Sequence, residues 1–113
     1  MAKLKPLLPS LREKKRYVVF EVLPENKVSF EEVKRTLENR IQEFLGVLET
    51  SKAGIIIMDK WDKNKGILRV SHNMLDKVKA AIVLIKEVNG KRVIIKTVGV
   101  SGILKKAQNK FYT

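Results

Sequence analysis

The sequence contains no cysteine and only one histidine, His72. Without cysteine the chain cannot form disulfides, thiolate metal sites or a cysteine nucleophile, and this composition is typical of a reducing compartment. A lone histidine cannot form an acid/base pair or a metal cluster by itself. Asp59 and Asp62 flank a predicted turn beside lysines, which favours surface residues over a magnesium pair. We therefore expect no catalytic residue, and no cofactor or metal bound by the protein.

Long apolar runs are also missing. The longest covers residues 80–85, far short of the roughly 20 residues that a membrane-spanning helix needs. The basic N-terminus has no apolar stretch long enough for a signal peptide. A chain of 113 residues is near the common size of one domain. Because Pro6 and Pro9 disfavour regular structure, we predict a basic arm over residues 1–11. Residues 12–113 should form a single domain of a soluble, cytoplasmic protein with no membrane partner.

Acidic residues are nearly absent from the two ends of the chain. Residues 1–20 hold six basic residues and one acid, residues 88–113 hold six basic residues and no acid, and residues 21–87 are almost balanced. About eleven of the twelve net positive charges therefore lie in the two terminal stretches. Like charges that are segregated in this way repel one another unless a polyanion neutralises them. The simplest such polyanion is a nucleic acid.

β-Branched and aromatic residues predict four strands, over residues 16–22, 54–61, 66–71 and 91–98. Tight turns are predicted at residues 62–66, where Asn and Gly accept a positive φ, and at residues 89–90. The glycines within residues 99–102 should break the last strand.

Helical spacing of apolar residues predicts a helix that begins after Ser29, which forms a capping box with Glu32, and ends near Gly46. Asn73 should cap a second helix. The buried face of this helix should comprise Met74, Val78, Ala81, Ile82 and Ile85. Val83 and Leu84 widen this face, which predicts that the helix is covered on two sides. A short basic helix is predicted over residues 103–111. The resulting β-α-β-β-α-β order with a C-terminal helix is typical of the ferredoxin-like α+β fold with an antiparallel sheet, which RNA-recognition domains also use.

Two basic segments are candidate phosphate-binding sites. One is the basic run over residues 11–17, which leads into the first predicted strand. The other is the glycine-containing stretch 99–102, whose Ser101 is a good N-cap for the last predicted helix. Lys105 and Lys106 follow near the start of that helix, where the helix dipole disfavours cations, and an anion bound at the exposed N–H groups would offset this penalty. The alternative is an ordinary turn with a solvated basic surface. The candidate RNA-binding residues are Arg12, Lys14, Lys15, Arg16, Arg69, His72, Lys96, Gly99, Ser101, Gly102, Lys105 and Lys106.

Aromatic residues make up only 6% of the chain. RNA-recognition motifs stack bases on aromatics of the central strands. Here the third strand has Ile67, Leu68, Arg69 and Val70 at those positions, so base stacking on the sheet is not expected. The second and fourth strands are apolar on both faces, which predicts cover on both sides. The sequence leaves open whether the N-terminal arm, the C-terminal helix or a partner protein covers the second face. The candidate partner interface comprises Ile55, Ile57, Val93 and Ile95.

Four segments together resemble archaeal ribonuclease P protein component 2: residues 8–17 (LPSLREKKRY), 52–55 (KAGI), 65–72 (KGILRVSH) and 93–107 (VIIKTVGVSGILKKA). The resemblance runs along essentially the whole chain. Lys96 departs from an expected arginine, and Ile103 from a common threonine, which weakens any hydroxyl contact there.

The resemblance implies a noncatalytic subunit of a ribonucleoprotein whose RNA removes the 5′ leader of precursor tRNA with bound magnesium. It also implies partners: the ribonuclease P RNA, protein component 3, other ribonuclease P proteins, and a second copy of the chain within a heterotetramer. Two alternatives remain at this point. One is a protein-interaction module of another RNA-containing complex, and the other is a stand-alone RNA-binding domain or nuclease.

Overall fold

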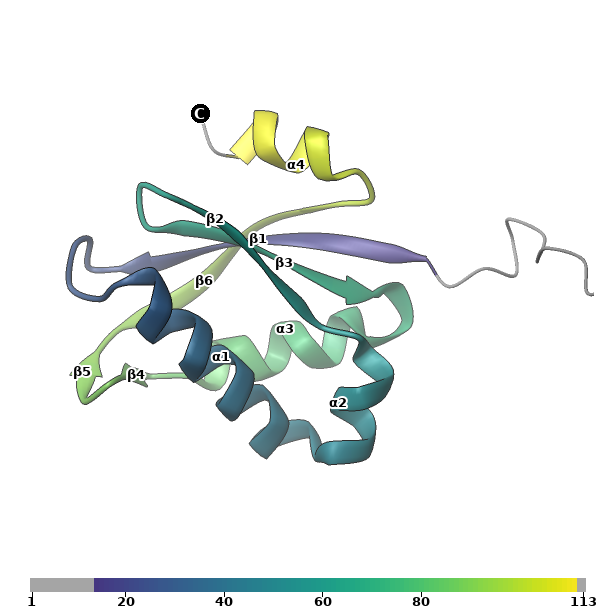
Figure 1. The fold of residues 1–113 in the computed structure, drawn as a ribbon, viewed down its shortest axis with the longest axis horizontal. Coiled ribbons are helices and arrows are strands. Elements are labelled where there is room, and N and C mark those ends of the chain that lie inside the picture. The colour runs from purple at the N-terminus through teal and green to yellow at the C-terminus, as the bar shows by residue number, and fades with distance from the viewer. Residues whose placement is uncertain (1–13, 112–113) are drawn as a thin grey trace, which may run out of the picture.

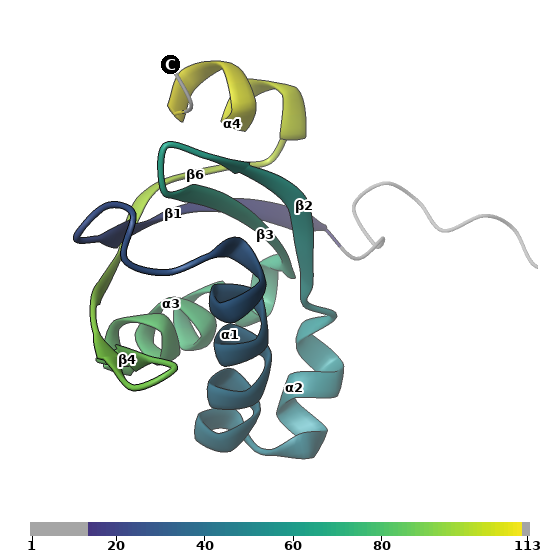
Figure 2. The same ribbon diagram turned by 60° about the vertical axis from the view of Figure 1, so that its left-hand side comes forward.

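The computed structural model describes residues 14–111, which form one α+β unit. A four-stranded antiparallel sheet has the order β2-β3-β1-β6. Three helices lie on one face of the sheet and α4 lies on the other (Figure 1, Figure 2). The elements are β1 (Lys15–Leu23), α1 (Phe30–Leu45), α2 (Val47–Ala53), β2 (Ile56–Asp62), β3 (Lys65–Ser71), the 3-10 helix η2 (His72–Met74), α3 (Leu75–Leu84), β4 (Glu87–Val88), β5 (Lys91–Arg92), β6 (Ile94–Ser101) and α4 (Leu104–Phe111). The predicted fold class is confirmed.

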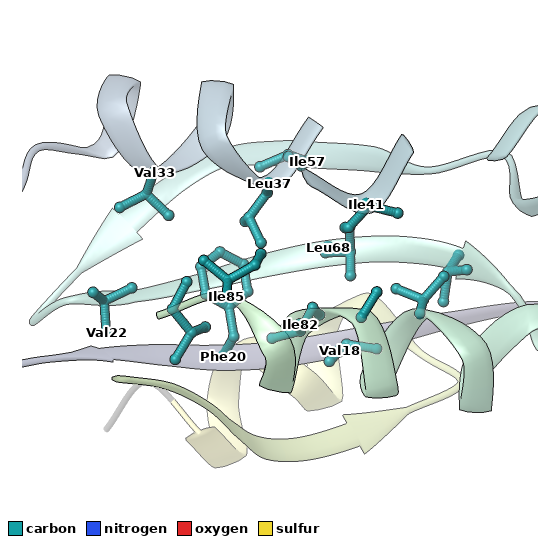
Figure 3. Packing of buried hydrophobic residues seen from close by; sticks show 14 of the residues in the cluster. Val18, Phe20, Val22, Val33, Leu37, Ile41, Ile57, Leu68, Ile82 and Ile85 are labelled. Atoms are coloured by element: carbon teal, nitrogen blue, oxygen red, sulfur yellow. The ribbon is translucent and has the colours of Figure 1, made fainter. Parts of the chain in front are cut away.

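The main core lies between the sheet and the helices α1 and α3 (Figure 3). Alternate residues of the central strand β1, Val18, Phe20 and Val22, point toward the helices and are fully buried. This alternation follows from the period of two in a strand, while α1 buries residues at helical spacing. The α1 residues in the core are Val33, Leu37 and Ile41.

Gly66 in β3 has no room for a side chain. It pairs with Phe20, and a Cβ atom at this position would lie 2.6 Å from Cζ of that ring. Because the ring is fully buried, it cannot move aside without disturbing the core. We expect Gly66→Ala to lower the free energy of unfolding by about 1–3 kcal/mol, measured by chemical denaturation. The same substitution should cost clearly less in a Phe20→Leu background, and an equal cost in both backgrounds would contradict this explanation.

The capping box at the start of α1 is confirmed. Ser29 Oγ accepts from the Glu32 N–H at 3.3 Å, and Glu32 Oε1 accepts from the Ser29 N–H at 2.9 Å. Glu32 Oε2 also accepts from the Asn89 amide, and Lys91 Nζ lies 3.8 Å from it. The carboxylate therefore joins the helix start to the β4–β5 hairpin.

These contacts lower the pKa of Glu32 below its ordinary value of 4.5, mainly through the Ser29 N–H and then the Asn89 amide. A carboxyl with a depressed pKa contributes stability that is present above its unfolded-state pKa and is lost as the pH falls through the folded-state pKa. We expect acidification from about pH 6 to pH 3 to lower the denaturation midpoint less in Glu32→Gln than in the wild-type chain. Glu31→Gln, at an exposed position in the same turn, should keep the wild-type slope.

The structure differs from the sequence predictions at three places. A short helix, α2, fills residues 47–53, for which the sequence predicted no element, and it ends at Gly54, whose φ is 56°. The predicted β2–β3 turn and the positive φ at its asparagine, Asn64, are confirmed, but the second positive φ belongs to Lys63, and the glycine of the prediction lies inside β3. Asn64 is buried there, and its Nδ2 donates to Val22 O at 3.2 Å. Asn73 does not cap α3, because it lies within η2 and α3 follows without a side-chain cap.

The helix α3, which corresponds to the second predicted helix, is also less covered than predicted. Its five predicted core residues are buried, but Val83 and Leu84 are 57% and 52% exposed. The helix therefore has one buried face, which packs on the sheet and α1 (Figure 2).

The last strand continues through the glycine that was predicted to break it. Gly99 pairs with Val19, and Ser101 pairs with Tyr17. A bulge at Val98 shifts the register, because Thr97 and Gly99 face consecutive residues of β1. Such a bulge accommodates an extra residue and allows a glycine inside the strand.

The second face of the sheet is covered in part by α4. Ala107 is fully buried against Val19 and Ile67, and Leu104 packs at the same cluster. The C-terminal helix, one of the three options left open by the sequence, therefore provides this cover (Figure 1). The N-terminal arm over residues 1–11 lies outside the described residues. Among the helices that the structure describes, none is long and apolar enough to cross a membrane.

The predicted partner-interface residues lie mostly in the interior. Ile57, Val93 and Ile95 are buried in the main core, and Ile55 packs against its margin. Ile57, Val93 and Ile95 are therefore not surface residues of this chain, and the alternation along β2 and β6 turns Ile57 and Ile95 toward the helices. The neighbouring residues Ile56 and Ile94 are the exposed ones, at 45% and 64%.

Candidate nucleic-acid interface

Antiparallel pairing brings the start of β1 and the ends of β3 and β6 to the same end of the sheet. Lys15 pairs with Ser71, and Tyr17 pairs with both Arg69 and Ser101. The N–H of His72 donates to Lys14 O at 2.8 Å. We call this region the basic end, at the right of Figure 1. It comprises the predicted site residues Lys14, Lys15, Arg16, Arg69, His72, Ser101, Gly102, Lys105 and Lys106.

Arg16 connects the two basic segments of the sequence. Its Nη1 donates to Lys15 O at 3.0 Å, and it lies 3.6 Å from the position that a Cβ atom of Gly102 would occupy. The guanidinium is therefore next to the turn that precedes α4. That spacing is an ordinary contact, so the fold itself does not require a glycine at residue 102. Its exposed backbone is open to close approach by a ligand.

Ser101 holds the turn into α4. Its Oγ accepts from the Ile103 N–H at 3.1 Å, while Ile103 O accepts from Ala107 N–H in the first helical turn. Ile103 is therefore the N-cap residue of α4, and Ser101 lies two positions earlier and stabilises the turn before the helix, so the prediction that Ser101 is the N-cap is wrong. The first turn of α4 has no acidic residue and carries the exposed Lys105 and Lys106. The helix dipole disfavours cations in the first turn of a helix. An anion bound at this turn would be stabilised by both the free N–H groups and the two lysines, and it would offset that penalty.

Arg69 lies on the α4 side of the sheet, between Ile56 of β2 and Tyr17 of β1. Its Nε is buried and has no hydrogen-bond partner among the described residues. A buried donor without an acceptor costs free energy.

Four cations of the basic end have no carboxylate partner within the part of the chain that the structure describes. Carboxylates within 4 Å pair with cations elsewhere, such as Lys34 with Asp59 and Lys96 with Glu21. No such pair forms among residues 14–111 for Lys14, Arg16, Lys105 or Lys106. The segregation of charge along the sequence therefore becomes a segregation in space.

The structure separates two predicted residues, Lys96 and Gly99, from this cluster and does not test a third. Lys96 Nζ lies 3.6 Å from Glu21 Oε1, farther along β6 toward the other end of the sheet. Gly99 is inside β6 rather than in the turn. Arg12 lies outside the described residues.

Lys52 is a basic residue that the sequence prediction missed. It is exposed in the last turn of α2, and its carbonyl accepts from Ser71 Oγ at 3.4 Å. Ser71 pairs with Lys15, so Lys52 extends the basic end toward the helix layer. The signal was not visible in the sequence because α2 itself was not predicted. Within the described residues, no group of three or more His, Asp or Glu side chains is placed to hold a metal ion.

Comparison with known proteins gives a consistent family relationship. The model of the Rpp14/Pop5 family matches residues 16–112. Ribonuclease P protein component 2 of Pyrococcus horikoshii is 39% identical, over 98% of this chain and 93% of that protein. The proteins of the same name from Methanocaldococcus jannaschii and Methanosarcina mazei are 41% and 35% identical, each over 96% of this chain and over 80% and 92% of their own lengths. A chain in a structure of yeast ribonuclease MRP has a similar fold, with a TM-score of 0.64 and 12% identity over 80% of this chain and 76% of that one.

Proposed function

This chain belongs to the Rpp14/Pop5 family, and from that premise we propose that it is a noncatalytic protein subunit of ribonuclease P. In this proposal the RNA subunit carries out the removal of the 5′ leader from precursor tRNA and uses magnesium for it. The protein binds that RNA, and its protein partners include component 3 and other ribonuclease P proteins. Two copies of the chain meet in the assembled heterotetramer.

One observation carries the RNA-binding part of the proposal. The unneutralised cations of both chain ends meet at the basic end, around the turn between Ser101 and α4. Arg16 of β1 and the α4 residues Lys105 and Lys106 would contact phosphates together, although the two elements are far apart in sequence. Gly102 would allow close approach of the backbone, and the partly exposed guanidinium of Arg69 would donate to an RNA oxygen. By screening phosphates, these contacts would stiffen the catalytic RNA and lower its demand for magnesium.

Salt dependence tests this proposal. Binding of the full chain to the full-length cognate ribonuclease P RNA should weaken as salt rises, with a log–log slope of about 0.7–0.9 per phosphate contact. If several cations of the basic end each contact a phosphate, the salt dependence should be steep, with a slope that corresponds to several phosphates. A slope near zero would contradict binding through this end, even if the chain still joined the complex through its protein partners.

A further inference from the structure

An apolar groove lies at the end of the sheet opposite the basic end. It is formed where β1 ends and β6 begins, and its volume is about 690 Å³. Ile94, on its rim, is 64% exposed. The lining residues are Leu23, Pro24, Lys86, Arg92, Val93 and Ile94.

The groove adjoins an open sheet edge. β6 is the last strand in the order β2-β3-β1-β6 and pairs only with β1 in the described structure. Before β6 begins, the Val93 N–H donates to Lys86 O at 2.9 Å and closes the β4–β5 hairpin. From Ile94 onward no strand of the described chain pairs with the outer side of β6 (Figure 1). Such an edge is a template for an added strand, because its outward N–H and C=O groups lack strand partners.

The charges around the groove indicate what would bind there. Lys86 and Arg92 are exposed and have no carboxylate partner among residues 14–111, whereas the adjacent Lys91 lies near Glu32. An RNA strand would bring phosphates to these two cations but would leave an apolar groove without a matching group. A peptide with both acidic and apolar side chains satisfies the two features together.

We propose that an extended segment of another protein, in which apolar and acidic residues alternate, binds along the β6 edge. Its backbone adds a strand to the sheet, its apolar side chains enter the groove beside Ile94, and its carboxylates lie near Lys86 and Arg92. This surface is separate from the basic end. The protein could therefore hold RNA at one end of its sheet and a protein partner at the other.

The test uses the full ¹⁵N-labelled chain and a short end-blocked peptide in which glutamate alternates with valine and isoleucine. We expect NMR shift changes centred on the β6 edge and the groove residues. Replacing glutamate by lysine in the peptide, or N-methylating alternate peptide amides, should weaken binding at least about tenfold. No shift change at millimolar peptide would overturn the proposal, as would equal binding of the N-methylated peptide.

Matched variants separate this site from other surfaces. Ile94→Asp should weaken peptide binding about tenfold, while Val83→Asp, at a similarly exposed position on α3, should leave it unchanged. A variant that loses cations of the basic end should bind the peptide normally, so failure here and failure of the RNA proposal are distinguishable. Displacement of the peptide by a single-stranded RNA oligonucleotide would instead assign the groove to RNA and contradict the proposal.

Discussion

Replacing Lys14, Arg16, Lys105 and Lys106 together by glutamine should weaken binding to ribonuclease P RNA by about three orders of magnitude near 0.1 M salt. The reason is the release of fewer counterions when four phosphate contacts are lost. The log–log salt slope should fall by about 0.7–0.9 for each contact. These four side chains have no carboxylate partner in the described chain, so their removal should leave the fold stable.

A control of equal charge tests whether position or net charge matters. Lys27, Lys34, Lys63 and Lys86 lie in the turns and helix layer away from the basic end, and changing them to glutamine removes the same charge. This variant should lose little affinity, because long-range attraction is screened beyond about 10 Å at 0.1 M salt. Equal losses in the two variants would show that the basic end is not the binding surface.

The second large effect is expected at Ala107, where α4 is anchored to the sheet. This residue is fully buried against Val19 and Ile67. Ala107→Asp would place an unpaired carboxylate in that cluster, at a cost of several kcal/mol, so the helix should undock rather than accept it. The main core on the other face should stay intact because none of its residues contributes to this cluster.

Hydrogen exchange and RNA affinity measure the two consequences. In Ala107→Asp the amides of α4 should exchange rapidly while those of β1 remain protected. RNA affinity should fall further than in Gln108→Asp, which adds the same charge at a partly exposed position of the same helix. Equal affinities of the two variants would mean that docking of α4 does not position the lysines for RNA.

β-Branched and aromatic residues were sufficient to predict the main strands, and the helical spacing of apolar residues was sufficient to predict α1. β1 is a run of β-branched and aromatic residues, the apolar residues of α1 repeat at helical spacing, and the capping box of Ser29 and Glu32 marks the helix start. The pattern could not predict α2, which follows α1 directly after Gly46 and has a single buried residue, Ala53. It also gave the wrong face for Ile57 and Ile95, because strands with apolar residues at successive positions do not reveal which side is buried.

The basic end was predicted only as a set of residues. The two charged segments are about 90 residues apart in the sequence, and only the antiparallel register brings Tyr17 beside Ser101. Lys96 was included because of its charge, but its register position opposite Glu21 places it elsewhere and gives it a partner. Which cations are left without a carboxylate depends on such pairings, and these are not visible in composition.

The measurement that tests the account most directly is cleavage of precursor tRNA by the cognate RNA and protein component 3 at modest magnesium. It would compare no added chain, the wild-type chain and the variant that lacks the four cations. The account predicts cleavage with the wild-type chain, little without it, and a raised magnesium requirement with the variant. Equal cleavage in all three reactions, or cleavage by the chain without RNA, would contradict a noncatalytic subunit that acts through its basic end.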